Sequence, residues 1–212
     1  MKNILVRNLL TVSSLLFALF GIAAPVAALP INVAQGKAVT ATGAIGIISP
    51  AGIVAGFGDA TAFPPAPLSS LVDGIYLPEG TGWQSGTVWW DEQNASSLNN
   101  IVEIDLNGFF MIDSISIQAD NNDEYLISYL NQFGVWVDYA YATAVGGAGM
   151  RERAGSVGSF EASAIRIDAR AGDGFYSVSE FQAIGQAVPE PSSILLIGVA
   201  LAWLGFGRSR KA

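Results

Sequence analysis

The chain of 212 residues carries 18 acidic and ten basic side chains, a formal net charge of −8, and 51% of its residues are hydrophobic. It has no Cys and no His, which excludes thiolate nucleophiles, imidazole bases, Ser/His/Asp triads, ordinary zinc sites and a disulfide framework. No basic residue lies between Lys37 and Arg151, so nucleic acid is a poor partner, whereas carboxylates and carbonyls suit calcium.

Residues 1–28 have the organisation of a secretory signal peptide. Lys2 and Arg7 precede an apolar run at residues 9–24, and Val26-Ala27-Ala28 supplies small residues before Leu29. We expect cleavage after Ala28, and an uncleaved signal anchor is the alternative. The chain is therefore expected to be exported.

The next segment begins with an expected strand at residues 33–42. Residues 43–67 then form an irregular insertion that is rich in Ala, Gly, Ile and Pro and closes with Pro64-Pro65-Ala66-Pro67. Its apolar character indicates that it packs against the body, because a flexible linker would be more polar.

Strand patterns dominate the rest of the body. Residues 102–106, 115–119 and 165–169 alternate apolar and polar side chains, which predicts strands with one buried face. Residues 125–129 and 135–137 flank Asn131-Gln132-Phe133-Gly134 and predict a hairpin. No useful helical period occurs in residues 68–187. The sequence therefore predicts one all-β domain at residues 29–187, a β-sandwich or jelly roll.

The C-terminal segment, residues 188–212, combines a proline motif with a short apolar run. Val188-Pro189-Glu190-Pro191 precedes the run at residues 194–206, and Arg208, Arg210 and Lys211 follow it. The run is shorter than the ~17 residues that a transmembrane helix needs, so it spans a bilayer only marginally. Its basic end would stay cytoplasmic and leave the body outside. A buried core helix is the alternative.

This order of features resembles the PEP-CTERM sorting signal, with Pro189, Glu190 and Pro191 as its motif. The resemblance implies recognition by an exosortase, a membrane protease-transpeptidase of Gram-negative bacteria that make extracellular polysaccharide. It further implies cleavage near the motif and a location in the cell envelope or outside the cell. Residues 194–206 would anchor the chain transiently in the inner membrane as a short hydrophobic helix. The resemblance does not cover the body.

The body has a second resemblance, to discoidin or coagulation-factor type C domains of the galactose-binding-like superfamily. Residues 32–40 resemble the opening strand, Asp73-Gly74 the Asp-Gly turn, and Thr81-Gly82-Trp83 the Thr-x-Trp element. Residues 101–106 and 178–181 resemble the central and closing strands. The insertion at residues 43–67 departs from a compact discoidin domain. The resemblance implies a discoidin-like β-sandwich.

Metal-containing members of that superfamily hold a calcium ion between the Asp-Gly loop and a Glu of the closing strand. The resemblance implies Asp73, Thr81 and Glu180 as ligands, helped by nearby carbonyls, although calcium takes six or more oxygens. The alternative is that Asp73 only forms an Asx turn and Glu180 is solvated. The acidic segment 120–123 lacks the spacing of a calcium loop, so we interpret it as a turn between strands.

Aromatic rings next to polar groups are the natural platform for sugars. Tyr76, Trp89 and Trp90 are the candidates, and in a strand the two adjacent Trp side chains point to opposite sides. By resemblance, Trp83 is a core residue. Packing in the core or at its rim is the alternative for all of these rings.

These observations favour a non-catalytic surface or extracellular protein that associates with glycan, such as extracellular polysaccharide. One alternative is a structural biofilm or matrix protein without a discrete sugar site. The other is a polysaccharide-processing enzyme with a carboxylate pair such as Asp91 or Glu92 and another acid, although nothing in the spacing selects a pair.

Overall fold

The computed structural model describes residues 29–48, 62–93, 96, 98–155 and 158–188. The expected signal peptide, the middle of the insertion and the sorting tail beyond residue 188 lie outside the described residues. No described helix is long and apolar enough to cross a membrane.

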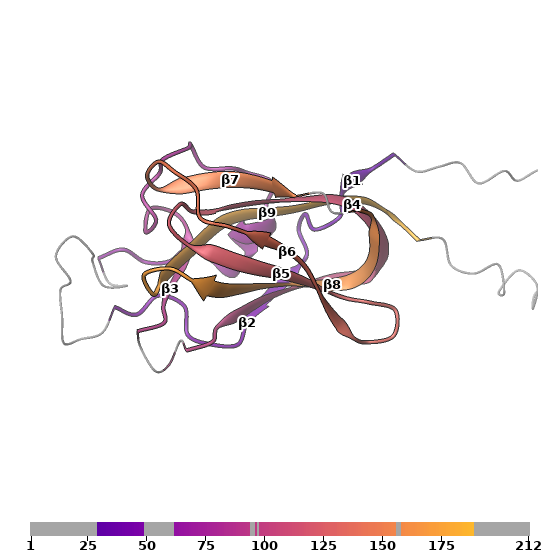
Figure 1. Cartoon of the computed structure of the whole chain (residues 1–212), viewed down its shortest axis with the longest axis horizontal. Coiled ribbons are helices and arrows are strands. Elements are labelled where there is room, and N and C mark those ends of the chain that lie inside the picture. The colour runs from indigo at the N-terminus through magenta and orange to yellow at the C-terminus, as the bar shows by residue number, and fades with distance from the viewer. Residues whose placement is uncertain (1–28, 49–61, 94–95, 97, 156–157, 189–212) are drawn as a thin grey trace, which may run out of the picture.

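The described residues form β-strands and one short 3₁₀ helix (Figure 1). The elements are β1 (Ile31–Asn32), β2 (Ala38–Ala41), η1 (Leu68–Val72), β3 (Val88–Asp91), β4 (Ile101–Asp120), β5 (Glu124–Leu130), β6 (Trp136–Ala142), β7 (Met150–Gly155), β8 (Phe160–Ala171) and β9 (Phe175–Ala187). The predicted all-β sandwich is confirmed.

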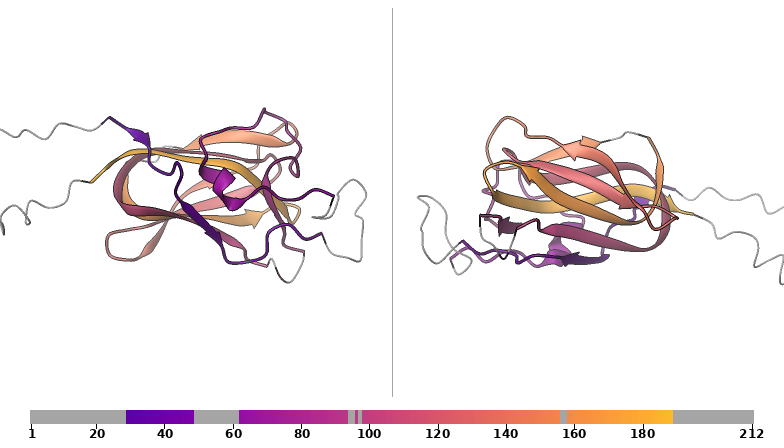
Figure 2. Two further views of the ribbon diagram at one scale, coloured as in Figure 1. Left: turned by 180° about the vertical axis from the view of Figure 1, so that it is seen from behind. Right: turned by 60° about the horizontal axis from the view of Figure 1, so that its bottom comes forward.

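Antiparallel pairing connects the strands in the order β1-β9-β4-β8-β5-β6, with β2 and β7 added on β4 and β3 on β9. The sheet folds over on itself into two layers (Figures 1 and 2). One layer contains β2, the first half of β4, β8, β5 and β6, and the other contains β1, β3, β9, the second half of β4 and β7. The two ends of the body leave the sandwich on the same side, where Ile31 pairs with Gly185.

The predicted strands at residues 102–106 and 115–119 are two halves of the single strand β4. Between them, the register with β8 shifts between Asp105 and Phe110, and Asn107 and Gly108 have φ angles of 54° and 141°. Few residues other than Gly adopt such angles, so the strand changes direction there. β4 thereby enters both layers.

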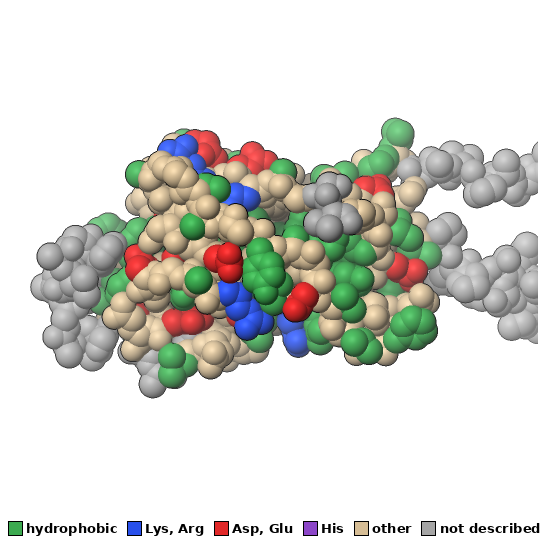
Figure 3. Space-filling model, viewed as in Figure 1, with side chains coloured by type: hydrophobic (Ala, Val, Ile, Leu, Met, Phe, Trp, Pro, Cys, Tyr) green, Lys and Arg blue, Asp and Glu red, His purple; other side chains and the backbone are tan. Residues whose placement is uncertain are grey.

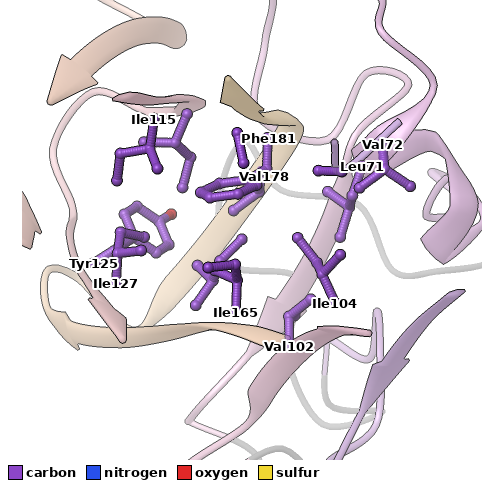
Figure 4. Close-up of a cluster of buried hydrophobic side chains, with 14 of the residues drawn as sticks. Leu71, Val72, Val102, Ile104, Ile115, Tyr125, Ile127, Ile165, Val178 and Phe181 are labelled. Carbon is purple, nitrogen blue, oxygen red and sulfur yellow. The ribbon is translucent and has the colours of Figure 1, made fainter. Parts of the chain in front are cut away.

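The core lies between the two layers and consists mainly of aliphatic side chains (Figure 4). Alternating positions of the predicted strands supply it, including Val102, Ile104, Ile127, Ile165 and Phe181, each at most 1% exposed. This confirms the inward faces that the alternation predicted. Leu71 and Val72 of η1 close the core on one side.

The expected strand at residues 33–42 is only partly right. β2 covers Ala38–Ala41, but residues 33–36 form a turn in which Gly36 has a φ of 69°. The side-chain oxygen of Asn32 accepts the N–H groups of Ala34 and Ala183, each at 3.2 Å. These bonds draw the chain out of an extended conformation and fasten the turn to β9.

The described ends of the insertion pack against the body. Gly46 forms a parallel bridge with Trp90, and Ile48 is 6% exposed in a small cluster with Trp89 and Phe175. The N–H of Ala66 donates to the carbonyl of Thr87 at 2.8 Å.

Replacing Ile165 by Ala will lower the free energy of unfolding by about 2–5 kcal/mol, because it leaves a cavity between the layers. Urea unfolding monitored by Trp fluorescence measures the change. The control is Val135→Ala at a side chain that is 53% exposed, which should change stability by about 0.5 kcal/mol or less. Equal effects of the two substitutions would contradict the described core.

Candidate functional site

The Asp-Gly turn lies against the closing strand, as the resemblance implied. The N–H of Gly74 donates to Oε1 of Glu180 at 3.0 Å, and the N–H of Ile75 donates to Oδ1 of Asp73 at 2.8 Å. The second bond is the Asx turn that was the alternative reading of Asp73. Gly74 has a φ of 87°, and a Cβ there would lie 2.7 Å from Nε2 of Gln35. Only glycine fits this turn without strain.

Glu180 is buried rather than solvated. It is 0% exposed, and its Oε2 is buried without a hydrogen-bond partner. Burial raises the pKa of Glu180 to about 7, the side chain of Gln182 opposes the rise, and the charge of Asp73 adds to it. Such an oxygen needs a proton or a cation, since a buried unpaired carboxylate is costly. The two predicted ligands Asp73 and Glu180 are therefore close neighbours.

Tyr76 lies near Glu180. Its ring is half-buried, next to Ile75, which is 64% exposed. Burial raises the pKa of Tyr76, a hydrogen bond with Ser116 opposes the rise, and Glu152 and Glu180 add to it. Ser116 in turn donates to Oε1 of Glu152 at 2.8 Å. The phenol thus lies among a hydroxyl and two carboxylates.

The loop after Tyr76 is fastened to β4 and β7. Leu77 exchanges two hydrogen bonds with the side-chain amide of Gln118, at 2.9 and 2.8 Å. Glu79 accepts the N–H of Glu152 at 2.9 Å and Nη1 of Arg151 at 3.1 Å. The N–H of Glu152 holds the pKa of Glu79 below its ordinary value. These bonds hold the backbone around Tyr76 in place. We define the Tyr76 surface as Asp73, Ile75, Tyr76 and Glu152, with the buried Glu180 next to them.

Thr81, the third predicted metal ligand, makes its contacts further along this loop. Its hydroxyl donates to the carbonyl of Pro78 at 2.6 Å, and its own carbonyl accepts the N–H of Met150 at 2.8 Å. A Cβ on Gly149 would lie 2.3 Å from that carbonyl oxygen. The contacts of Thr81 thus join the loop to β7.

Trp89 and Trp90 are both 0% exposed. They point to opposite sides of β3, as predicted: Trp90 lies in the central core, and Trp89 in the small cluster with Ile48 and Phe175. Trp83 packs edge-on against Trp89 in that small cluster and not in the central core. Both Trp89 and Trp90 therefore pack inside the protein, as the alternative to sugar binding proposed, and neither ring is accessible to a sugar in this structure. Tyr76 is the remaining candidate.

The segment 120–123 forms the predicted turn between β4 and β5, but its acids are buried, which the sequence did not reveal. Asp120 is 6% and Asp123 0% exposed, and Asp173 of the neighbouring loop interacts with both. Arg153 donates to the backbone carbonyls of Asp120, Asp123 and Ala119 rather than to the carboxylates. Among the described residues, no group of three acids is placed to hold a metal ion.

Asp123 is the most perturbed acid of this cluster. Burial raises the pKa of Asp123 to about 8, and the charges of Asp120 and Asp173 add to the rise. Its Oδ2 accepts the hydroxyl of Tyr125 at 3.3 Å, a bond that favours the ionised form but does not offset burial. Burial therefore favours the neutral acid over the carboxylate at Asp123.

Comparison with known proteins identifies the C-terminal sorting motif. The PEP-CTERM protein-sorting motif matches residues 187–211, which confirms the sorting signal predicted there and marks the chain for export and sorting through a membrane-associated system. No curated protein matches the chain.

Three solved structures with a similar arrangement of strands are carbohydrate-binding modules. The first is the family 32 module of NanJ from Clostridium perfringens in complex with galactose, at 19% identity and a TM-score of 0.49, covering 74% of this chain and 98% of the module. The second, CpGH89CBM32-5 from the same organism in complex with GalNAc-β-1,3-galactose, has 14% identity, a TM-score of 0.48 and coverage of 73% and 98%. The third is the fucose-binding module SpX-3 of Streptococcus pneumoniae, at 11% identity, a TM-score of 0.47 and coverage of 72% and 96%. Similarities of this size carry no argument about the ligand of this chain.

The raised pKa of Asp123 predicts a stability that falls with pH. The folded protein holds a proton that the unfolded chain, with an Asp pKa near 4, has lost, so the benefit is complete below about pH 4 and is lost as the pH rises through about 8. Asp123→Asn should remove a slope approaching about 1.4 kcal/mol per pH unit within this window. Urea unfolding between pH 5 and pH 9 measures it. The exposed Asp105→Asn is the control, and parallel profiles for wild type and Asp123→Asn would refute the assignment.

Proposed function

We propose that this protein is an exported, non-catalytic surface or extracellular protein that associates with glycan through the Tyr76 surface. The observation that carries the proposal is the position of Tyr76, half-buried beside the exposed Ile75 and held near the carboxylates of Glu152 and Glu180. An aromatic edge offers a sugar ring an apolar contact, while the exposed carboxylate of Glu152 can accept hydrogen bonds from its hydroxyl groups. The fixed loop reduces the entropy lost on binding.

The sorting motif supports a specific route to the surface. An exosortase-type protease is the expected partner, because it would recognise Pro189, Glu190 and Pro191. Residues 194–206 would anchor the chain transiently in the inner membrane, with the basic end on the cytoplasmic side. The body would then face the polysaccharide outside the cell, which is the glycan that it meets first.

Calcium is part of the proposal at the Asp73–Glu180 pair. The buried, unpartnered Oε2 of Glu180 beside the charge of Asp73 is the arrangement that a hard cation would neutralise. Backbone carbonyls of the turn would supply further ligands, and Thr81 is the third ligand that the resemblance implies. The ion would connect the Asp-Gly turn to β9 and would thus be structural.

A structural matrix protein without a sugar site is the second candidate. The tip of the β5–β6 hairpin favours it, because Phe133 is 78% and Val135 53% exposed. β6 also ends the strand order and pairs only with β5 among the described strands, which leaves an edge that could add another chain. Self-association of the protein without any glycan would favour this reading.

The acids considered for catalysis have structural bonds in the described chain. Asp91 is 2% exposed and accepts the N–H of Gln93 at 2.9 Å, and Glu92 accepts the indole N–H of Trp90 at 3.2 Å. These bonds support a non-catalytic role for both residues.

Replacing Tyr76 by Ala should weaken binding of the best monosaccharide or disaccharide on a glycan array by about tenfold, since it removes the stacking surface. Phe109→Ala is the matched control, because this ring is 41% exposed and lies at the bend of β4. Full-length protein with each substitution is compared with wild type. Unchanged binding of short glycans by Tyr76→Ala would reject the Tyr76 surface as the site.

Calcium should raise the melting temperature of the full-length protein relative to EDTA, by mass action on the folded state. At a free concentration of about 100 times the dissociation constant, the gain is ~2.7 kcal/mol. Glu180→Gln should remove the response, whereas Glu124→Gln, a substitution in β5, should keep it. An identical calcium response in wild type and Glu180→Gln would disprove the site.

A further inference from the structure

The outward face of β5, β6 and β8 carries buried side chains outside the central core. Leu126 is 2% and Ser128 7% exposed, although they alternate with the core residue Ile127 and so point away from the core. The outward face of a sandwich layer is normally solvated. Other outward side chains must therefore cover these two residues, and the face is an ordered layer of side chains.

Trp136 is the first aromatic residue of this layer. The guanidinium of Arg166 lies 3.7 Å from the centroid of its ring, and Nε of Arg166 donates to Oε2 of Glu103 at 3.0 Å. The ring is thus fixed by a cation–π contact whose cation is itself held by a carboxylate.

Tyr141 is the second aromatic residue, and its ring is 56% exposed. It pairs with Leu126 across β5–β6, and Leu126 pairs with Asp168 on its other side. Asp168 forms an ion pair with Arg170 at 2.7 Å. An exposed ring and a carboxylate–guanidinium pair therefore occur together a second time on the same face.

A β-bulge places both rings on this face. Residues 136 and 141 are five positions apart and would point to opposite sides of a regular strand. The register shifts between Ile127 and Ser128, where Ala140 and Asp138 are the successive partners on β6, so Tyr139 is the extra residue. Tyr139 packs against Tyr129 and Phe160.

Trp136 and Tyr141 mark the two ends of one strip of side chains. We call it the sheet-face strip, and it comprises Glu103, Trp136, Tyr141, Arg166, Asp168 and Arg170. The partners of the two rings on β5, Leu130 and Leu126, are four residues apart, which corresponds to about 13 Å along the strand. Figure 3 shows this face of the molecule, where acidic and basic side chains are interspersed with hydrophobic ones. One sugar ring cannot reach both ends, whereas an extended chain can.

The charges of the strip indicate whether it would bind an anionic or a neutral polysaccharide. The carboxylates of Glu103, Asp168 and the adjacent Asp138 outnumber the guanidinium groups of Arg166 and Arg170, so a polyanion is repelled. Hydroxyl groups can donate to the carboxylates and accept from the guanidinium groups, while the rings stack on the sugar faces. We propose that the sheet-face strip is a second glycan site, which binds an extended neutral polysaccharide chain on the face opposite the Tyr76 surface.

The test is a calorimetric titration of full-length protein with neutral gluco-, galacto- and N-acetylglucosamine oligosaccharides from monosaccharide to hexasaccharide, and with oligogalacturonides of equal length. In at least one neutral series, wild type should bind the hexasaccharide more than about tenfold tighter than the disaccharide, because only the longer chain reaches both rings. Trp136→Ala and Tyr141→Ala should each remove this gain with length. The exposure of Tyr141 makes its variant informative even if Trp136→Ala fails to fold.

The matched control is Phe133→Ala, which removes a ring that is 78% exposed at the nearby hairpin tip and should keep the gain. Tyr76→Ala should also keep it, so failure of the Tyr76 surface and failure of the strip are distinguishable. Absence of binding to every neutral series, affinity that does not depend on length, preference for oligogalacturonides, or equal losses in Phe133→Ala and Tyr141→Ala would each overturn the proposal.

Discussion

The continuous pairing of β4 is the constraint on which the rest of the structure depends. Its first half aligns β2 and β8, its second half aligns β7 and β9, and the bend at Asn107 and Gly108 carries it from one layer to the other. The same strand presents Glu103 to the sheet-face strip and Gln118 to the loop after Tyr76. The two outward surfaces thus have their positions set by one element, and a shift of its register would disturb both.

Within the described part of this acidic protein, the buried acids Asp123 and Glu180 have no basic side chain as an ion-pair partner. Arg153 donates its N–H groups to the backbone carbonyls of Ala119, Asp120 and Asp123 rather than to the buried carboxylates. Asp123 and Glu180 consequently remain buried with raised pKa values. Burial without an ion-pair partner favours the protonated form of both acids, so the stability of the fold is linked to pH.

Local periodicity predicted the inward faces of the strands well, because alternation is set by the backbone of each strand alone. It could not show that residues 102–106 and 115–119 form one strand, since Asn107 and Gly108 look like an ordinary break in the pattern. Nor could it show the burial of Trp89. Alternation placed one of the two adjacent Trp rings opposite the core without saying which. The structure shows that it is Trp89, and that Ile48 and Phe175, distant in sequence, cover it there. Of the three predicted rings only Tyr76 remains a candidate, and contacts with Gln118 hold its loop in place.

Alternation along a strand assigns side chains to the wrong face beyond a β-bulge, and the sheet-face strip is an example. Sequence spacing alone assigns Trp136 and Tyr141 to opposite sides of β6, and one of them would then enter the core. The extra residue Tyr139 reverses the assignment, and its ring gains contacts with Tyr129 and Phe160 that offset the lost ladder pairing. A regular strand would bury one aromatic ring without any cost in pairing. The bulge instead keeps both rings outward beside ion pairs, which is the arrangement that the binding proposed for the sheet-face strip requires.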